Sequence, residues 1–261
     1  CPAGAPLDGI VATRYRHGLL TNRIKVIEAG HPVPDEAGEA AAKDMLRRVR
    51  AQGRDDLLLV LVSGGGSSLL TLPAAGLSLA DLKATTRELL GSGAPIQSIN
   101  TVRKHLSRIK GGRLAARLHP ARSLTLAISD VPGDDPSIIA SGPTVPDATT
   151  AADALKLLRR WNIAIPPQIA AVLDGPEGET PKPGDPIFSK AELRIIARPA
   201  DSLEAAAAIG RAAGYEVIAL GDSLEGEAAE VGKAHGRMAV EALNAGRRVL
   251  FLSGGELTVT I

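Results

Sequence analysis

The sequence contains a single cysteine, Cys1, among its 261 residues. One cysteine cannot form a disulfide within the chain, and such usage is typical of proteins kept in the reducing cytoplasm. Aromatic residues make up only 2% of the chain, so Leu, Val, Ile and Ala must supply the core. Few side chains are therefore available to stack on nucleobases. These shortages exclude a disulfide scaffold and argue against a stacking surface for single-stranded nucleic acid.

The sequence also lacks an excess of charge of one sign and any long hydrophobic run. Thirty Lys and Arg residues face 29 Asp and Glu residues, a net charge of +1, whereas a nucleic-acid backbone is held by concentrated positive charge. No apolar run approaches the roughly 20 residues that cross a bilayer. The N-terminus shows no charged segment followed by an apolar one, as a signal peptide would. We expect a cytoplasmic protein with neither nucleic acid nor membrane as a partner.

The composition is that of a folded protein, with 44% hydrophobic and 23% charged residues. Short β-branched and Leu-rich runs alternate with amphipathic stretches, a pattern typical of βαβ units. Four of these runs are apolar throughout, as expected for strands covered by helices on both faces: Leu57–Val62, Leu124–Ile128, Val217–Leu220 and Val249–Leu252. We predict an α/β fold with a doubly wound, mostly parallel sheet, helices on both faces and a second, smaller α/β domain.

Helix patterns and loop composition suggest where the two domains divide. Helices are predicted over Asp35–Gln52, Leu79–Leu90, Gln97–Leu118, Ala151–Trp161, Ser202–Ala213 and Gly226–Asn244. The segment Asp174–Pro186 is rich in Gly and Pro and is predicted to be an exposed linker. We assign residues 1–185 to a Rossmann-like domain and 186–261 to an incomplete second α/β segment. Because the chain begins without Met and closes on a strand-like run, Leu257–Ile261, we expect a fragment.

A glycine-rich loop directly follows the predicted strand Leu57–Val62. Glycines let backbone N–H groups converge on an anion, and serine hydroxyls add donors. A tight strand-to-helix connection is an equally good interpretation. The spacing matches neither the dinucleotide-binding fingerprint nor the Walker sequence, which disfavours a hydride-transfer enzyme and a P-loop kinase. The residues predicted to bind substrate here are Ser63, Gly64, Gly65, Gly66, Ser67 and Ser68.

A second loop of similar design follows the strand Val249–Leu252. Its residues Gly254, Gly255 and Glu256 are predicted to contact a cofactor. Two anion loops would suit two ligands, or they could be remnants of one repeated unit.

The predicted helix Gln97–Leu118 carries a cationic stripe at i, i+3, i+4 and i+7 spacing. Its members are Asn100, Arg103, Lys104, Ser107 and Lys110. Such a stripe is more often a solvated surface than a site. The pair Gly111 and Gly112, which costs about 2 kcal/mol of helix propensity, instead suggests a break where side chains meet a ligand.

Carboxylates follow the predicted strand Leu124–Ile128, at the edge where doubly wound folds place their chemistry. Asp130 and Asp134 are candidate Mg²⁺ ligands, because Mg²⁺ takes one or two carboxylates together with substrate oxygens and water. Either residue could instead stabilise the turn by accepting hydrogen bonds from the backbone. After another strand, His31 could bind substrate or hydrogen-bond to the backbone, and the backbone interpretation is favoured.

Seven segments, in order along nearly the whole chain, resemble the glycerate 2-kinase family that carries the MOFRL domain, some members of which have been labelled hydroxypyruvate reductases. The segments are Glu28–Asp35, Ser63–Ser67, Asn100–Arg113, Ile128–Asp147, Thr180–Asp185, Gly221–Glu227 and Leu252–Thr260. The resemblance implies a two-domain α/β protein that phosphorylates the C2 hydroxyl of D-glycerate with ATP and Mg²⁺. Ser68 and Leu257 depart from the residues usual in the family.

The resemblance also implies roles for individual residues. Lys104 and Asp130 would be catalytic, and Asp130 with Asp134 would hold the metal. Asn100 and Arg103 would bind substrate beside the first glycine loop, and Lys110 would contact the nucleotide with the second. Family members carry an earlier segment with a functional lysine and a later Gly-Arg-Gly-Gly-Arg-Asn segment, and this sequence lacks both. The resemblance therefore implies that this chain alone could be inactive.

Three hypotheses follow for the function. The first is an ATP- and Mg²⁺-dependent glycerate 2-kinase, with a small hydroxy acid and a nucleotide as its ligands. The second is an NAD(P)H-dependent hydroxypyruvate reductase, which the absent dinucleotide fingerprint disfavours. The third is a non-catalytic fragment that binds glycerate or nucleotide. Association into a homodimer is compatible with each of them.

Overall fold

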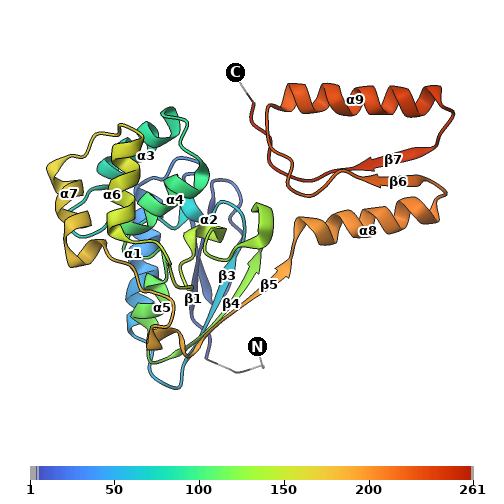
Figure 1. Ribbon diagram of the computed structural model, residues 1–261. Helices are drawn as coiled ribbons and strands as arrows, with labels where there is room; N and C mark the ends of the chain where they lie inside the picture. Colours follow the sequence, from blue (N-terminus) through green and yellow to red (C-terminus); the bar gives the residue numbers. More distant parts are fainter. Residues whose placement is uncertain (1–3, 5, 260–261) are drawn as a thin grey trace. The chain divides into compact units, whose positions relative to one another are not determined.

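The computed structural model describes residue 4 and residues 6–259, and it divides them into two compact units (Figure 1). Unit 1 comprises the described residues up to Leu126 together with Pro136–Arg194. Unit 2 comprises Ala127–Asp135 and the described residues from Ile195 onward. Cys1 and Ile261 lie outside the described residues. No helix in the described ranges is both long enough and apolar enough to cross a membrane.

Parallel strands and flanking helices build both units, which confirms the predicted α/β class. In unit 1, β1 (Gly9–Arg14) pairs in parallel with β2 (Ile24–Ala29), and α1 (Glu36–Arg50) packs against them. In unit 2, the parallel pair β6 (Glu216–Ala219) and β7 (Val249–Leu252) is flanked by α8 (Pro199–Ala212) and α9 (Ala228–Asn244), one on each side of the pair (Figure 1). The helices bury the apolar faces of these strands.

A three-stranded sheet, in the order β3-β4-β5, completes the strands of the described residues. It consists of β3 (Leu57–Val62), β4 (Arg122–Ile128) and β5 (Ala191–Ala197). The N–H of Ser123 donates to Lys190 O and the N–H of Ser129 to Ala197 O, so β4 and β5 run in the same direction. The described strands thus form three small sheets of two, three and two strands.

A helical layer forms the largest hydrophobic core of unit 1. Two of its helices begin with capping boxes, in which a hydroxyl and a carboxylate satisfy the first free N–H groups, at Ser78 with Asp81 and at Thr150 with Asp153. The layer consists of α3 (Leu79–Gly91), α4 (Ile96–His105), α6 (Ala151–Arg160) and α7 (Pro167–Asp174). Their apolar faces meet through Leu82, Leu89, Ile99, Val102, Leu106, Leu158, Ile169 and Leu173.

The single helix predicted over Gln97–Leu118 is wrong, because the structure has two helices there. After α4 ends at His105, a buried turn leads to α5 (Arg113–Leu118). Gly111 and Gly112 adopt φ values of 56° and 80°, and a Cβ on Gly112 would lie 2.7 Å from Phe188 Cζ. The glycine pair therefore breaks the helix so that the backbone can pack closely, and the predicted continuous stripe does not exist.

The segment predicted to be an exposed linker, Asp174–Pro186, has several exposed residues, but it lies within unit 1 and does not separate the two units. Short 3₁₀ turns, η3 (Pro176–Gly178) and η4 (Pro186–Phe188), fold this segment onto unit 1. Gly178 and Thr180 are buried, and Gly178 O accepts a hydrogen bond from His105 Nδ1 at 2.7 Å. Gly and Pro here shape a packed turn rather than a spacer.

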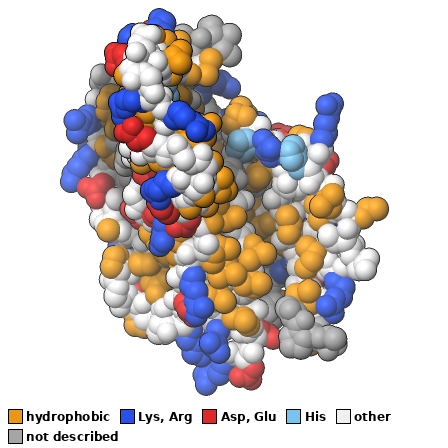
Figure 2. Space-filling model, turned by 90° about the vertical axis from the view of Figure 1, so that its right-hand side faces the viewer, with side chains coloured by type: hydrophobic (Ala, Val, Ile, Leu, Met, Phe, Trp, Pro, Cys, Tyr) orange, Lys and Arg blue, Asp and Glu red, His pale blue; other side chains and the backbone are white. Residues whose placement is uncertain are grey.

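Strand β3 is not covered on both faces, contrary to expectation. Its side chains alternate between partly buried and exposed, and Leu61 is 70% exposed. Hydrophobic side chains also spread over much of the surface that faces the viewer in Figure 2. Among the described residues, only one face of β3 is therefore covered by other parts of the protein.

Candidate functional site

The glycine loop after β3 ends in the one-turn helix α2 (Gly66–Leu69). Gly65 has φ 82°, a left-handed conformation that glycine adopts without steric cost. Both the N–H and the hydroxyl of Ser68 donate to Gly65 O at 3.1 Å, which holds the turn. A Cβ on Gly66 would lie 2.7 Å from Ala140 Cβ, so this glycine permits close contact with a neighbouring segment. Ser63 and Gly64 remain exposed at the end of β3.

That neighbouring segment contains three successive residues in the left-handed region. Ala140, Ser141 and Gly142 have φ values of 50°, 62° and 57°. For residues other than glycine this conformation costs about 1 to 3 kcal/mol, and such strain concentrates at functional sites. Ser141 is fully buried, with its Oγ 2.8 Å from Ser67 Oγ and 3.5 Å from Asn100 Oδ1. The strained turn thereby fixes the position of Ser67.

Two cations converge on the carbonyl oxygen of Ser67. Arg103 Nη2 donates to it at 3.1 Å and Lys110 Nζ at 2.6 Å. Burial lowers the pKa of Arg103; burial, and then the neighbouring Arg103 charge, hold the pKa of Lys110 well below its usual value. In the described part of the chain, neither cation forms an ion pair with a carboxylate. This concentration of positive charge would be stabilised by an anion.

Lys104, although adjacent to Arg103, belongs to a different cluster. Its Nζ lies 3.3 Å from Asp147 Oδ1, and both side chains are buried. Asp147 also accepts from the hydroxyls of Thr149 and Thr180. Burial by itself would raise the pKa of the Asp147 carboxyl, but Lys104 and the bonds from Thr149 hold that pKa below its usual value. Lys104 is therefore engaged within unit 1, and among the described residues its side chain forms no hydrogen bond with the glycine loop.

The two candidate metal ligands differ in what surrounds them. Asp130 is exposed after β4, in unit 2. Asp134 is paired with Arg198, whose Nε lies 3.2 Å from its carboxylate. No group of three or more His, Cys, Asp or Glu side chains suited to a metal ion occurs among the described residues. Asp130 is thus the better placed of the two to take a cation.

The second glycine loop has a structural explanation within unit 2. The N–H of Gly254 donates to Gly221 O, and Gly254 O accepts from Leu224 N, both at 2.9 Å. A Cβ on Gly255 would lie 2.1 Å from Leu224 O. These glycines allow two backbones to approach each other, while Glu256 is exposed. Their predicted contact with a cofactor stays a prediction.

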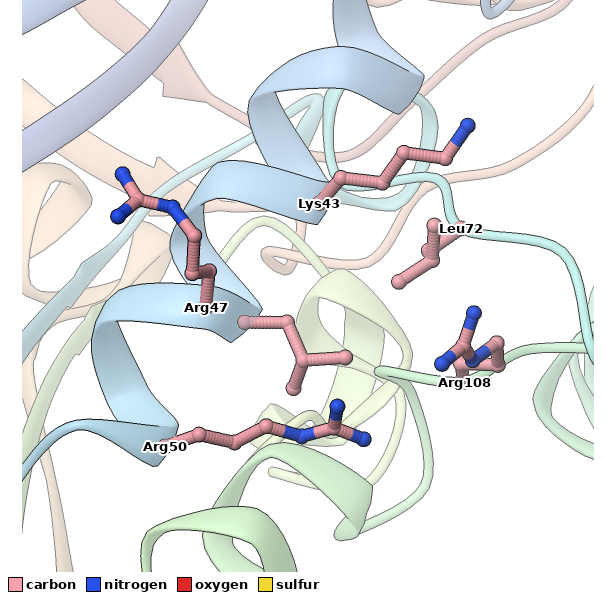
Figure 3. A pocket seen from close by; sticks show the side chains of 6 residues that line it. Lys43, Arg47, Arg50, Leu72 and Arg108 are labelled. Atoms are coloured by element: carbon pink, nitrogen blue, oxygen red, sulfur yellow. The ribbon is translucent and has the colours of Figure 1, made fainter.

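A basic hollow of about 210 Å³ lies at the end of α1 (Figure 3). Arg50 and Arg108 point into it, whereas Arg47 points away. It shares no residue with the glycine loop or its cations, and basic side chains are common in the last turn of a helix, where they complement the helix dipole. We assign it no chemistry. Its lining consists of Lys43, Leu46, Arg47, Arg50, Leu72 and Arg108.

The structure thus brings together Ser67, Asn100, Arg103 and Lys110 of the predicted site. It adds Ser141, to which the sequence assigned no role, and His31, for which a hydrogen bond to the backbone was the favoured interpretation. Ser141 could have been suspected from the polar segment that follows the acidic turn, but nothing in the sequence reveals its left-handed backbone. His31 lies against Gly65, since a Cβ there would come within 2.8 Å of the imidazole Nε2.

Comparison with known proteins shows the family to which the chain belongs. A domain of unknown function (DUF4147) matches residues 3–174. A protein of Agrobacterium vitis, provisionally named a hydroxypyruvate reductase, is 50% identical over 260 residues, which cover 98% of this chain and 58% of that protein. The glycerate 2-kinase of Pyrococcus horikoshii is 41% identical over 261 residues, 97% of this chain and 59% of that protein.

The crystal structure of Thermotoga maritima glycerate kinase superposes on this chain with a TM-score of 0.84 at 37% identity. The match covers 97% of this chain and 61% of that one. This chain therefore spans about 60% of the length of these relatives. The matching domain, the sequence identity and the shared fold agree: the chain belongs to the glycerate 2-kinase family.

Proposed function

We propose that the chain carries the substrate-anion site of an ATP-dependent kinase that phosphorylates D-glycerate to 2-phosphoglycerate. The observation that carries the proposal is the pair of buried cations, Arg103 and Lys110, at the Ser67 carbonyl. They have no carboxylate partner among the described residues, and a carboxylate or phosphate would supply one. Phosphoryl transfer requires mainly that two anionic reactants be positioned and their charge neutralised. Relatives named glycerate kinase support the choice of acid.

The chemistry assigned to individual residues follows from their surroundings. Arg103, through its planar guanidinium, suits a bidentate contact with the carboxylate of glycerate. Lys110, as a point charge beside it, would stabilise negative charge on the ligand. Lys104, which the sequence predicted to be catalytic, is assigned instead to holding Asp147. Ser67 and Ser141 orient the loop through their hydroxyls.

ATP and Mg²⁺ are part of the proposal. Mg²⁺ is held in most kinases by one or two carboxylates together with phosphate oxygens and water, and it neutralises the phosphate charge. Asp130 fits this requirement because it is exposed and has no ion-pair partner in the described ranges, whereas Arg198 occupies Asp134. Asp130→Asn is expected to lower kcat at least tenfold, and a smaller loss contradicts the metal assignment. A cytoplasmic location accords with this use of ATP.

The test is a product-resolved assay with D-glycerate, ATP and Mg²⁺, read by ³¹P NMR. Formation of 2-phosphoglycerate supports the proposal, and absence of product from folded protein rejects kinase activity for this chain. Arg103→Met should raise the KM for glycerate about tenfold or more, since a charge-assisted bond contributes about 1.5 to 3 kcal/mol. Arg108→Met, which alters the separate basic hollow, is the matched control and should leave KM within twofold.

A reductase is the second candidate, favoured by the provisional name of the Agrobacterium vitis relatives. Hydroxypyruvate reduction would consume NADH or NADPH, which is followed by the loss of absorbance of the reduced nicotinamide. We expect no such loss, because the glycine loop lacks the dinucleotide spacing. Enzyme-dependent oxidation of the nicotinamide would favour the reductase over the kinase.

A further inference from the structure

His31 lies where two loops of unit 1 meet. It follows β2, and the glycine loop follows β3, so both sit at the carboxyl ends of strands, where parallel α/β folds bind ligands. The imidazole packs directly against the backbone of Gly65: a Cβ there would lie 2.8 Å from His31 Cδ2 and Nε2. The absence of a side chain at Gly65 is what admits the ring.

The loop that carries His31 is anchored on both sides of the histidine. A Cβ on Gly30 would lie 2.5 Å from Val33 O, so residues 30–33 form a tight turn that excludes a larger residue. Asp35 caps α1 by accepting from the N–H of Gly38 at 3.0 Å, and the Tyr15 hydroxyl donates to it at 2.6 Å. His31 is thus presented by fixed backbone.

The imidazole itself is exposed and has no hydrogen-bond or ion-pair partner within the ranges the structure describes. The favoured sequence interpretation, a hydrogen bond to the backbone, is therefore wrong for His31. His105 provides the contrast, because it is fully buried and donates to Gly178 O at 2.7 Å. An anchored, solvent-accessible imidazole without a protein partner is available to a ligand.

We propose that His31 is a ligand-binding residue of the glycine-loop site. Its imidazole donates a hydrogen bond to the ligand at the Gly65 end of the loop, while Arg103 and Lys110 attract the ligand at the Ser67 end. This assignment rests on the proposed function and deepens it. The ligand class it implies is a small acid with two polar ends, such as a phosphoglycerate, rather than a single inorganic anion.

The test is calorimetric titration of the full chain with 2-phosphoglycerate and, separately, with inorganic phosphate. His31→Gln should raise the Kd for 2-phosphoglycerate at least tenfold. His119→Gln is the matched control, because His119 is also exposed and also precedes a proline, and its Kd should stay within twofold of wild type. Thermal midpoints of both variants should match wild type, which shows that folding is unchanged.

A Kd for His31→Gln within twofold of wild type overturns the assignment. Equal weakening of phosphate and 2-phosphoglycerate overturns the two-ended ligand. Wild-type protein that binds neither compound overturns both parts.

Binding and turnover separate this proposal from the proposed function. Protein that binds 2-phosphoglycerate through His31 but forms none of it from ATP and glycerate rejects the kinase and keeps the His31 site. Protein that forms product, with KM and Kd unchanged in His31→Gln, keeps the kinase and rejects the His31 site.

Discussion

The carbonyl oxygen of Ser67 accepts hydrogen bonds from both Arg103 and Lys110. This contact holds two positively charged side chains close together in a buried place, which lowers the stability of the folded protein. A buried ammonium next to a guanidinium loses hydration and is repelled, which is why the pKa of Lys110 falls. Lys110 therefore reduces the stability of the folded protein, but it also supplies positive charge for an anion. Functional sites often lower stability in this way.

Lys110→Met is therefore expected to stabilise the anion-free protein by about 1 kcal/mol at pH values below the lowered pKa of Lys110, where the buried side chain is charged. Removal of a buried charge gains about 1 to 4 kcal/mol, and loss of the bond to Ser67 offsets about 1 kcal/mol. Because the folded pKa lies below 10.5, the unfolded chain binds more protons between that lowered pKa and 10.5. Wild-type stability should rise with pH across this window, and the advantage of the variant should shrink.

Urea unfolding in phosphate-free buffer measures this difference as a function of pH. Lys156→Met is the control, because the Lys156 side chain is 75% exposed and its replacement should change the free energy of unfolding by less than about 0.5 kcal/mol. If Lys110→Met lost more than about 2 kcal/mol of stability across the whole pH range measured, the account of the buried charge would be contradicted.

Gly65 permits a second prediction at the residue scale. Gly65 and Gly76 have similar φ values, 82° and 86°, but only a Cβ on Gly65 would meet another residue, His31. Gly76→Ala should cost about 1 kcal/mol from backbone strain, and Gly65→Ala should cost more. When His31 is also replaced by Ala, the additional cost of Gly65→Ala over Gly76→Ala should disappear. Thermal unfolding of Gly65→Ala and Gly76→Ala, each with and without His31→Ala, measures this difference. An additional cost that persists when His31 is replaced would mean that His31 does not pack on Gly65.

At the scale of elements, Asp147 joins α4 to the turn around Thr180. It pairs with Lys104 of α4 and accepts from the Thr180 hydroxyl, and a Cβ on Gly111 would lie 3.3 Å from its carboxylate. This junction holds the end of α4 in place. It thereby sets where Arg103 and Lys110 meet the glycine loop.

Asp147→Asn should destabilise the protein by about 3 to 5 kcal/mol, because Lys104 would be left buried and unpaired. The depressed pKa of Asp147 also predicts a pH dependence: its contribution is present above the unfolded value of 3.8 and is lost as pH falls through the lower folded pKa. Chemical unfolding at pH 7 and at acid pH tests both statements. Asp174→Asn, at an exposed position, should change stability by less than about 0.5 kcal/mol.

The elements also show the limits of pattern reasoning. The Gly111–Gly112 pair correctly suggested a break in the predicted helix, but its cause is packing against Phe188 and Val145 rather than a ligand. Periodicity placed Lys110 on a helix with Arg103, whereas the turn after His105 brings both to one oxygen atom. Propensity cannot foresee a contact that depends on residues distant in the sequence.

For the whole molecule, a ligand that binds unit 1 should stabilise that unit. Trp161, the one tryptophan of the sequence, lies in unit 1, so its fluorescence reports the unfolding of that unit. An anionic ligand at about 100 times its Kd should add about 2.7 kcal/mol to the free energy of unfolding seen by Trp161. Arg103→Met should reduce this gain. No shift with 2-phosphoglycerate in wild type would contradict an anion site in unit 1.

The exposed apolar surface of β3 is relevant to whether two copies of the chain associate. The exposed leucines of β3 show that apolar surface is available, but a homodimer stays a prediction of the sequence. Light scattering coupled to size exclusion measures the mass directly.

The sequence by itself determined the α/β class and most strand and helix positions, because these depend on local periodicity, capping and residue type, which are properties of neighbours along the chain. It indicated the family through the resemblance of seven ordered segments. Only the tertiary structure decided that Lys104 pairs with Asp147 and that Arg103 and Lys110 share the Ser67 carbonyl. It also decided that His31 lies against Gly65 with no hydrogen-bond partner among the described residues. Whether a polar side chain is satisfied or available depends on partners tens of residues away, which no local pattern records.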